Sequence, residues 1–298
     1  MLDLRARLAS LRVKAQARQE ATSASSSPLA GRLERLRPAR GSNPRPTAEA
    51  LAASLGGQVV AANLIEVAQS LPLPVRHGRV SIKSGRALAA AARAVGRIGD
   101  PIAPETLLFL DTETTGLAGG TGTVAFAVGL GWIDGARLRL VQWLITGFAG
   151  ERELLARVRA RLARSELLIS FNGKSFDVPL LKARARLAGS ELPFEGVGHL
   201  DLLHVTRRFL KVGWPDCRLR TAEVEALRLQ RVNDLPGAEA PAAWRRWLDR
   251  GDGSLLGRVL EHNRADLLSL AALLALLERP TSREAPLFHG PLALIGSG

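Results

Sequence analysis

Two apolar segments separated by an Asp-Gly pair constrain the fold of this chain more than any other feature. "TVAFAVGLGWI" precedes Asp134-Gly135, and "ARLRLVQWLI" follows it. An Asp-Gly pair between two such runs is among the strongest short-range signals for a β-hairpin. We therefore expect two antiparallel strands joined by a tight turn.

The segments around this hairpin alternate between strand and helix patterns. One helix is amphipathic, with Leu154, Leu155, Val158 and Leu162 facing inward. The order strand, hairpin, helix, strand, helix, strand, helices predicts an α/β layered domain with a mixed sheet. The strand "ETLLFLD" precedes the hairpin. The hairpin is followed by the helix "GERELLARVRARLARS", the strand "ELLISFN" and the helix "KSFDVPLLKARARLAG", which has Pro179 in its first turn. The strand and helix "HLDLLHVTRRFL" and the long helix "GSLLGRVLEHNRADLLSLAALLALLER" complete the pattern.

The chain divides by composition into four parts. Residues 1–47 mix Ser, Pro, Gly and Arg and are expected to form a basic, disordered arm with one short helix. Residues 48–100 are expected to form a small N-terminal extension with short strands and one helix. Residues 101–280 carry the α/β pattern, and residues 281–298 form a tail.

The net charge of +13 is concentrated in the first third of the chain. Residues 1–100 hold 16 Lys and Arg against 6 Asp and Glu, which gives +10 and leaves +3 for the remainder. A basic arm on a nearly neutral body fits a polyanion such as nucleic acid, although an Arg-rich composition explains the charge equally well. One cysteine excludes an internal disulfide framework. No apolar run approaches the ~20 residues of a membrane span, and we expect a cytoplasmic protein.

Four acidic residues and one histidine stand where a catalytic site could form. Asp111 and Glu113 end the first strand, and the two-residue period of a strand puts both side chains on one side. Asp177 follows a later strand, and His262 lies four residues before Asp266 on the last helix. Such carboxylates can hold two hard divalent cations, which clamp the attacking and leaving oxygens of a phosphodiester. A nearby histidine can accept the proton of the attacking water.

Each of these pieces alone is common. A D-x-E pair is often a solvated strand end, Asp177 could be a helix N-cap, and His262 with Asp266 could be an exposed pair. The Gly-Lys-Ser beside Asp177, residues 173–175, is not a phosphate-binding P-loop, because the loop's first glycine would fall on Leu168 in an apolar run. The order of the acids along the chain is more informative than any one of them.

Three segments together resemble a known family. "FLDTETTG", "FNGKSFDVPLL" and "HNRADLLSL" are similar to the three exonuclease motifs of the DnaQ-like DEDD 3′–5′ exonucleases, which have a ribonuclease H-like fold. "HLDLLHVTRR", "CRLRTAEVEALRL" and "LPGAEAPAAWRRWLDRGD" add a resemblance to the YprB-type branch. The resemblance covers about residues 100–280 and implies a mixed five-stranded sheet with flanking helices.

The resemblance also implies roles for single residues. Asp111 would bridge two divalent ions, Mg²⁺ or Mn²⁺; Glu113 and Asp266 would complete the first ion site and Asp177 the second. His262 would be the general base. "HNRAD" departs from the family, because it combines a histidine with the three-residue spacing of the tyrosine-type enzymes.

Other residues are expected to contact nucleic acid or to support the site. We expect Asp201 to orient ligands rather than to form a metal cluster with His199 and His204. Trp244 and Trp247 could stack bases, but a packing face is the stronger interpretation. The expected nucleic-acid contacts are Thr114, Gly116, Asn172, Lys174 and Arg220; a flexible glycine loop and an exposed lysine are alternatives for Gly116 and Lys174.

The combined hypothesis is a metal-dependent nuclease, a 3′–5′ exonuclease that acts on DNA or RNA strand ends by a two-metal mechanism. Two alternatives stay open at this point. One is a nucleic-acid-binding module of the same fold without cleavage, and the other is a structure-selective endonuclease, because this fold hosts many chemistries.

Overall fold

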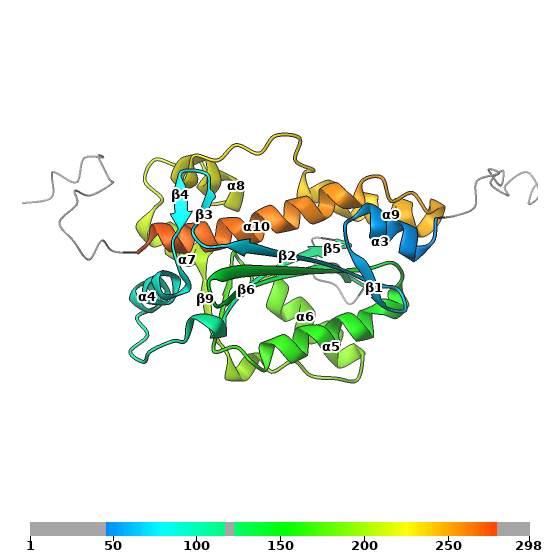
Figure 1. Ribbon diagram of the computed structural model, residues 1–298, viewed down its shortest axis with the longest axis horizontal. Helices are drawn as coiled ribbons and strands as arrows, with labels where there is room; N and C mark the ends of the chain where they lie inside the picture. The colour runs from blue at the N-terminus through cyan, green and yellow to red at the C-terminus, as the bar shows by residue number, and fades with distance from the viewer. Residues whose placement is uncertain (1–45, 117–121, 279–298) are drawn as a thin grey trace, which may run out of the picture. The chain divides into compact units, whose positions relative to one another are not determined.

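The computed structural model describes residues 46–116 and 122–278, and a mixed sheet between two helical layers dominates this part of the chain. Helix α10 crosses one face of the sheet, while α5 and α6 cover the other (Figure 1). The expected disordered arm up to residue 45 and the tail from 281 lie outside the described residues.

The helices and strands follow the order expected from the sequence. Their bounds are α3 Ala48–Ser54, β1 Gln58–Ala61, β2 Leu64–Pro72, β3 Val75–His77, β4 Val80–Ile82, α4 Gly85–Gly96, β5 Leu107–Thr114, β6 Ala125–Asp134, β7 Arg137–Ile145, α5 Glu151–Leu162, β8 Leu167–Ser170, α6 Asp177–Leu187, β9 Gly198–Asp201, α7 Leu202–Phe209, α8 Leu219–Ala222, a π-helical turn Glu223–Leu227, α9 Ala240–Arg250 and α10 Leu256–Leu276.

The main sheet has seven strands in the order β1-β2-β7-β6-β5-β8-β9. The five strands β7-β6-β5-β8-β9 form the expected mixed sheet. In it, β5, β8 and β9 run parallel to one another, and β6 is antiparallel to both of its neighbours, β5 and β7. The two further strands come from the segment expected to be a small extension, because β2 pairs with β7 along its whole length. The fold class is confirmed, and the sheet is two strands wider than expected.

The hairpin is formed as the Asp-Gly pair predicts. Asp134 pairs with Arg137 across the turn, and Gly135 has a φ of +57°, which glycine adopts without steric cost. Because the turn sets the pairing, residues 138–144 of β7 each have a defined partner on β6.

Apolar faces hold the helices on the sheet. The four residues expected to face inward from α5, Leu154, Leu155, Val158 and Leu162, are all buried. Pro179 lies in the first turn of α6, where its missing N–H has no partner to lose. Trp244 and Trp247 are buried with 1% and 4% exposure, so their packing interpretation is confirmed.

Helix α10 is long enough to carry residues over the centre of the sheet. It packs on β5, β6 and β7, and its residues His262 and Asp266 line a cavity together with residues of β5. Among the helices that the structure describes, α10 included, none combines the length and hydropathy needed to span a bilayer.

Candidate active site

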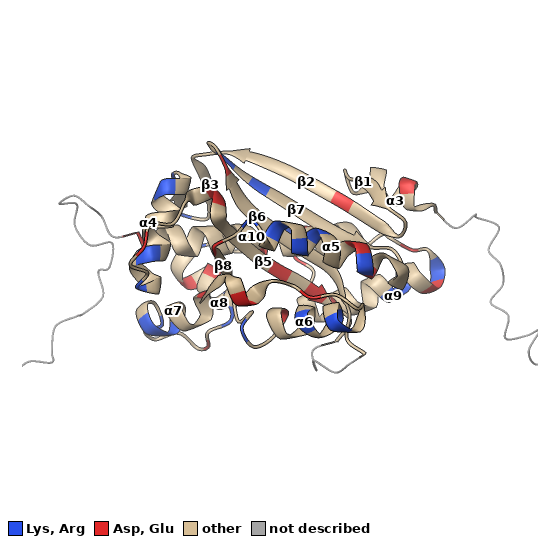
Figure 2. Ribbon diagram, turned by 90° about the horizontal axis from the view of Figure 1, so that it is seen from below, with Lys and Arg blue, Asp and Glu red and all other residues tan. Residues whose placement is uncertain are grey.

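The site forms where β5 and β8, which are parallel, both end. Asp111 and Glu113 project from β5 toward the α10 face, and Glu113 is 7% exposed. Figure 2 marks acidic residues on β5 in red. Because the carboxyl ends of parallel strands lie at one edge, the loop after β8 brings Asp177 to the same place.

Asp177 is the first residue of α6 and reaches back to β5. Its Oδ1 accepts a hydrogen bond of 2.5 Å from Thr112 Oγ1. Phe176 occupies the cap position without a side-chain bond, so Asp177 is not the helix N-cap. Gly173 allows this approach, because a Cβ there would lie 2.3 Å from Ser170 Oγ and 3.3 Å from Asp177 Oδ2. The Gly-Lys-Ser segment is therefore a loop that positions an aspartate.

Asp201 holds this loop in place from β9. Its carboxylate accepts hydrogen bonds from Asn172 N at 2.7 Å, Lys174 N at 3.1 Å and Leu203 N at 3.0 Å. Asn172 has a φ of +65°, a conformation that asparagine tolerates better than most residues. Asp201 is 2% exposed, so its oxygens are committed to the backbone, as expected for a supporting residue.

Helix α10 brings His262 and Asp266 over the end of β5. Both line a cavity of about 220 Å³ together with Asp111 and Glu113. His262 Nδ1 lies 2.8 Å from Asp234 Oδ1, and its Nε2 lies 3.8 Å from Asp266 Oδ2. Four of the five expected catalytic residues thus share one cavity.

Burial and repulsion from neighbouring carboxylates raise the pKa of Asp111, Glu113 and Asp177. Burial, then Asp266, Glu113 and Asp177, raise the pKa of Asp111 well above its usual range. Burial and the neighbouring carboxylates Asp266 and Asp177 do the same to Glu113. Burial raises the pKa of Asp177 to about 6, against the opposing hydrogen bond from Thr112. Such a cluster binds positive charge strongly.

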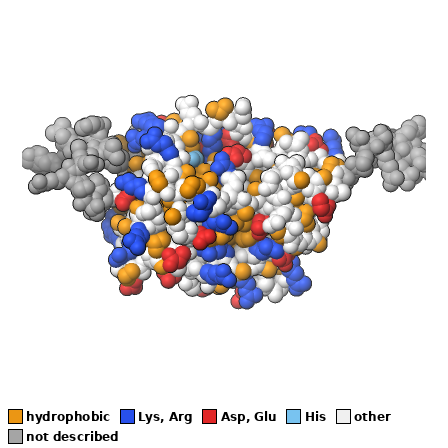
Figure 3. Space-filling model, viewed as in Figure 1, with side chains coloured by type: hydrophobic (Ala, Val, Ile, Leu, Met, Phe, Trp, Pro, Cys, Tyr) orange, Lys and Arg blue, Asp and Glu red, His pale blue; other side chains and the backbone are white. Residues whose placement is uncertain are grey.

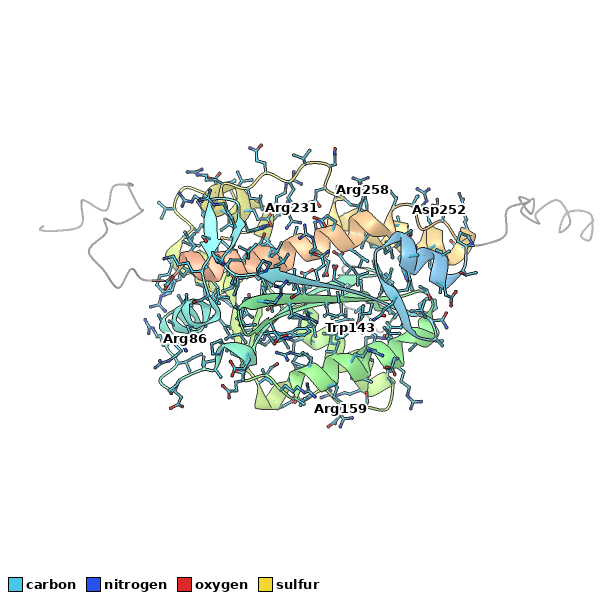
Figure 4. All side chains as sticks on the ribbon, in the orientation of Figure 1. Arg86, Trp143, Arg159, Arg231, Asp252 and Arg258 are labelled. Carbon is cyan, nitrogen blue, oxygen red and sulfur yellow. The ribbon has the colours of Figure 1, made fainter. Side chains whose placement is uncertain are left out.

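Arg231 supplies the positive charge nearest to Asp266. Its guanidinium donates to Asp266 and to Glu223, and its Nη1 lies 3.6 Å from Asp234. Arg231 and Glu223 are 10% and 1% exposed, so the ion pair is shielded from water. Burial lowers the pKa of Arg231, but the two carboxylates outweigh it and raise the value. Figure 4 labels Arg231 beside α10.

The carboxylates of this cluster are chemically suited to hard divalent cations, but their oxygens are not arranged around a common ion position. Carboxylate oxygens are the ligands that Mg²⁺ and Mn²⁺ prefer, and four carboxylates lie close enough together here to raise the pKa of Asp111 and Glu113. Within residues 46–116 and 122–278, however, no group of three or more His, Cys, Asp and Glu side chains is arranged to hold an ion. Thr112 occupies one oxygen of Asp177, and Arg231 occupies Asp266. Both contacts must loosen before these oxygens are free.

A second, larger cavity opens on the α6 side of the same acids. It has a volume of about 730 Å³, and Asp111 and Asp177 lie in its wall. Of the expected nucleic-acid contacts, Thr114, Gly116 and Asn172 line it. Lys174 instead lines a separate cavity of about 360 Å³, and Arg220 is exposed on α8 and lines neither. The central part of the glycine-rich segment, residues 117–121, is outside the described residues.

Several residues at the site had no role in the sequence analysis. Arg231, Asp234 and Glu223 lie in and before a long connection, where no periodicity marks them. Asn263 and Gln142 are fully buried polar residues, with 0% and 3% exposure. A signal existed for Gln142, because a lone polar residue within the apolar run "LVQWLI" needs a partner.

Comparison with known proteins agrees with this architecture. The profile of the RNase H superfamily matches residues 108–278, more than half of the chain. The uncharacterized protein YprB of Bacillus subtilis (strain 168) is 37% identical over 170 residues, which are 56% of this chain and 40% of YprB. The family B DNA polymerase of the archaeon Pyrobaculum calidifontis superimposes with a TM-score of 0.48 at 13% identity, over 76% of this chain and 30% of the polymerase. The chain is therefore similar to two fifths of YprB and belongs to the RNase H superfamily.

Proposed function

We propose that this protein is a metal-dependent 3′–5′ exonuclease that hydrolyses the terminal phosphodiester of a DNA or RNA strand. Membership of the RNase H superfamily supports a nuclease-type function with a nucleic acid as substrate. One observation carries the finer proposal. One cavity is lined by Asp111, Glu113, Asp266 and His262, and the larger cavity on the α6 side is lined by both Asp111 and Asp177.

The chain's own groups have distinct roles in this proposal. Asp111, Glu113 and Asp266 would hold one divalent cation, and Asp111 and Asp177 a second. When bound, such ions polarise the phosphate and stabilise the leaving 3′ oxygen. Arg231 would release Asp266 as the cation arrives, because a divalent charge competes with a single guanidinium for the same oxygens.

His262 would take the proton from the attacking water. His262 Nδ1 lies within hydrogen-bond distance of both Asp234 Oδ1, at 2.8 Å, and Arg231 Nη1, at 3.2 Å. In this proposal Nδ1 carries the proton of the neutral imidazole and donates it to the Asp234 carboxylate. The lone pair of Nε2 is then available as the base. His262 lines the same cavity as Asp111, Glu113 and Asp266, so a spacing with only three residues between His262 and Asp266 still places the histidine beside the acids.

The strand end would enter through the 730 Å³ cavity. Phe176 and Leu187 line this cavity with 55% and 63% exposure, which leaves apolar surface for stacking bases. Arg186, on the same helix, is exposed at its rim and can meet a phosphate. On the face drawn in Figure 3, basic side chains are scattered among acidic ones and form no continuous stripe.

A degradation time course tests the proposal. The substrates are 5′-labelled, 3′-labelled and circular single strands and duplexes of DNA and RNA, each with Mg²⁺, Mn²⁺ or EDTA. The proteins are the full chain, Asp111→Asn, and the control Asp252→Asn. Asp252, labelled in Figure 4, lies in the connection before α10 and accepts hydrogen bonds from Arg246 and Ser254.

A metal-dependent ladder on 5′-labelled linear strands is the expected result. Asp111→Asn should lose more than the roughly 100-fold that removing a partner behind a metal ligand costs, and Asp252→Asn should match the unmodified chain. Cleavage of circular strands would show that the protein is an endonuclease rather than an exonuclease. Full activity of Asp111→Asn would refute the mechanism.

A non-catalytic binding module is the second candidate, and the contact between Arg231 and Asp266 favours it. In that arrangement one acid of the cluster is already neutralised by the protein. Such a module would bind strands with salt-dependent affinity, yet it would give no ladder with either metal.

A further inference from the structure

Three neighbouring strands place one residue each in a single row below α10. Asp111 on β5 pairs with Gly129 on β6, and Gly129 pairs with Gln142 on β7. Residues paired across strands share a face of the sheet. The row therefore consists of an acid, a glycine and an amide, and the glycine leaves a gap in its middle because it has no side chain.

Asn263 fills the gap from α10 and connects the two ends of the row. Its Nδ2 donates to Asp111 Oδ2 at 2.7 Å and to the Asp111 carbonyl oxygen at 3.2 Å. Its Oδ1 accepts from Gln142 Nε2 at 2.7 Å. Asn263 is 0% exposed, so these bonds do not compete with water.

A backbone carbonyl fixes the direction of this chain of hydrogen bonds. Gln142 Nε2 also donates to the carbonyl oxygen of Leu260 at 2.6 Å, and a carbonyl oxygen can only accept. The Gln142 amide nitrogen must therefore face Asn263, which must present its oxygen to Gln142 and its NH₂ to Asp111. Oδ2 of Asp111 is thereby held as an acceptor, and Oδ1 remains for another partner.

Only glycine leaves room for Asn263 in the row. A Cβ at position 129 would lie 2.1 Å from Asn263 Oδ1 and 2.9 Å from Leu267 Cδ1. Both obstacles are side-chain ends, so a methyl group would displace Asn263 while the strands stay paired.

We propose that Asn263, oriented by Gln142 and admitted by Gly129, is a positioning residue that holds Asp111 in the orientation needed to bind a divalent cation. This inference rests on the proposed function, because it takes Asp111 as a cation ligand. Partners of this kind fix the orientation of a ligand, and their loss typically weakens metal binding by 10- to 100-fold.

Calorimetric titration of the full chain with Mn²⁺ alone tests the proposal without reference to cleavage. Gly129→Ala changes no polar group and should weaken Mn²⁺ binding by about 10- to 100-fold. Gly131→Ala is the matched control, because it is on the same strand and face, and the three atoms nearest to its Cβ would be Leu140 Cδ2 at 3.1 Å and Phe109 Cβ and Cδ2 at 3.4 and 3.6 Å. The control should bind Mn²⁺ within about twofold of the unmodified chain.

Gln142→Glu is the second variant and decides the question if Gly129→Ala does not fold. A carboxylate cannot donate to Asn263, so the asparagine would turn its oxygen toward Asp111 and repel it. We expect weaker Mn²⁺ binding although the variant adds a negative charge, whereas attraction through space alone would strengthen it. Circular dichroism confirms that each variant is folded before titration.

The outcomes separate this inference from the proposed function. Unchanged or tighter Mn²⁺ binding by the folded variants, with weaker binding by Asp111→Asn, would overturn the role of Asn263 and leave the cation site intact. If Asp111→Asn binds Mn²⁺ as tightly as the unmodified chain, the cation site itself is wrong, and the positioning role falls with it.

Discussion

Replacing Asp177 by asparagine should stabilise the protein at neutral pH in the absence of divalent cations. The asparagine Oδ1 can still accept the hydrogen bond from Thr112, so the change removes a buried charge and little else. The pKa of Asp177 rises from 3.8 to about 6, a shift of about two units. At about 1.4 kcal/mol per unit this shift corresponds to about 3 kcal/mol. Because Asp177 lines an open cavity, solvent screening reduces the gain, and we expect about 1–3 kcal/mol.

The pH dependence of this gain follows from the sign of the shift. Between pH 3.8 and about 6 the folded protein binds the Asp177 proton more tightly than the unfolded chain does, so the stability of the unmodified protein falls as pH rises. Asparagine does not titrate. The difference between variant and unmodified protein should therefore be small below about pH 4, grow through this window and level off above about pH 6.

Urea unfolding followed by tryptophan fluorescence in EDTA, at half-unit steps from pH 3.5 to 8, measures this difference. Asp252→Asn is a control of opposite sign, because hydrogen bonds from Ser254 and Arg246 lower the pKa of Asp252 to about 2. That carboxylate contributes stability above about pH 4 that is lost as pH falls, so its removal should not stabilise the protein at pH 7. No gain for Asp177→Asn at pH 7, or a gain that is the same at every pH, would refute the reasoning.

Three further substitutions test other parts of the structure. Arg231→Gln should destabilise the protein by about 3–5 kcal/mol in EDTA, because Glu223 would stay buried without its cation; a urea midpoint equal to that of the unmodified chain would contradict the ion pair. Asp201→Ala should lower the free energy of unfolding by about 1–3 kcal/mol, because buried backbone N–H groups lose their acceptor. Hydrogen exchange at Asn172 N should accelerate, and unchanged exchange would argue against a role of Asp201 in holding the loop after β8. Trp247→Ala should cost about 3–5 kcal/mol by leaving a cavity, while single-strand affinity, measured where the variant is folded, should not change. Weaker binding at unchanged stability would restore a base-stacking role for this tryptophan.

Local pattern predicted those parts of the fold that depend on nearby residues. The Asp134-Gly135 turn and the spacing of Leu154 and Val158 on α5 are properties of a few consecutive residues, and the structure contains both as expected. Local pattern did not predict the width of the sheet. β2 pairs with β7, which lies about 70 residues later, and the short apolar runs before residue 100 carry no signal for that partner.

Asp111, Glu113 and Asp177 could be predicted as site residues because each stands at the end or the start of an element, whereas Asp266, in the middle of α10, was predicted from its spacing to His262. Asp111 and Asp177 follow apolar strands, and parallel pairing of those strands brings strand ends together. The partners of these acids could not be recognised in the same way. Arg231 and Asp234 lie in an irregular connection, and only the folded chain places them against Asp266 and His262.

The sequence by itself determined the hairpin, the helices and the set of acids, because turn chemistry and periodicity act over a few residues. Only the tertiary structure decided that Asp111, Gly129 and Gln142 stand in one row with Asn263 above them. Register across three strands depends on how the whole sheet pairs, and a shift of one residue would turn each of these side chains to the opposite face. The glycine and the glutamine within the apolar strands acquire their meaning only from that register.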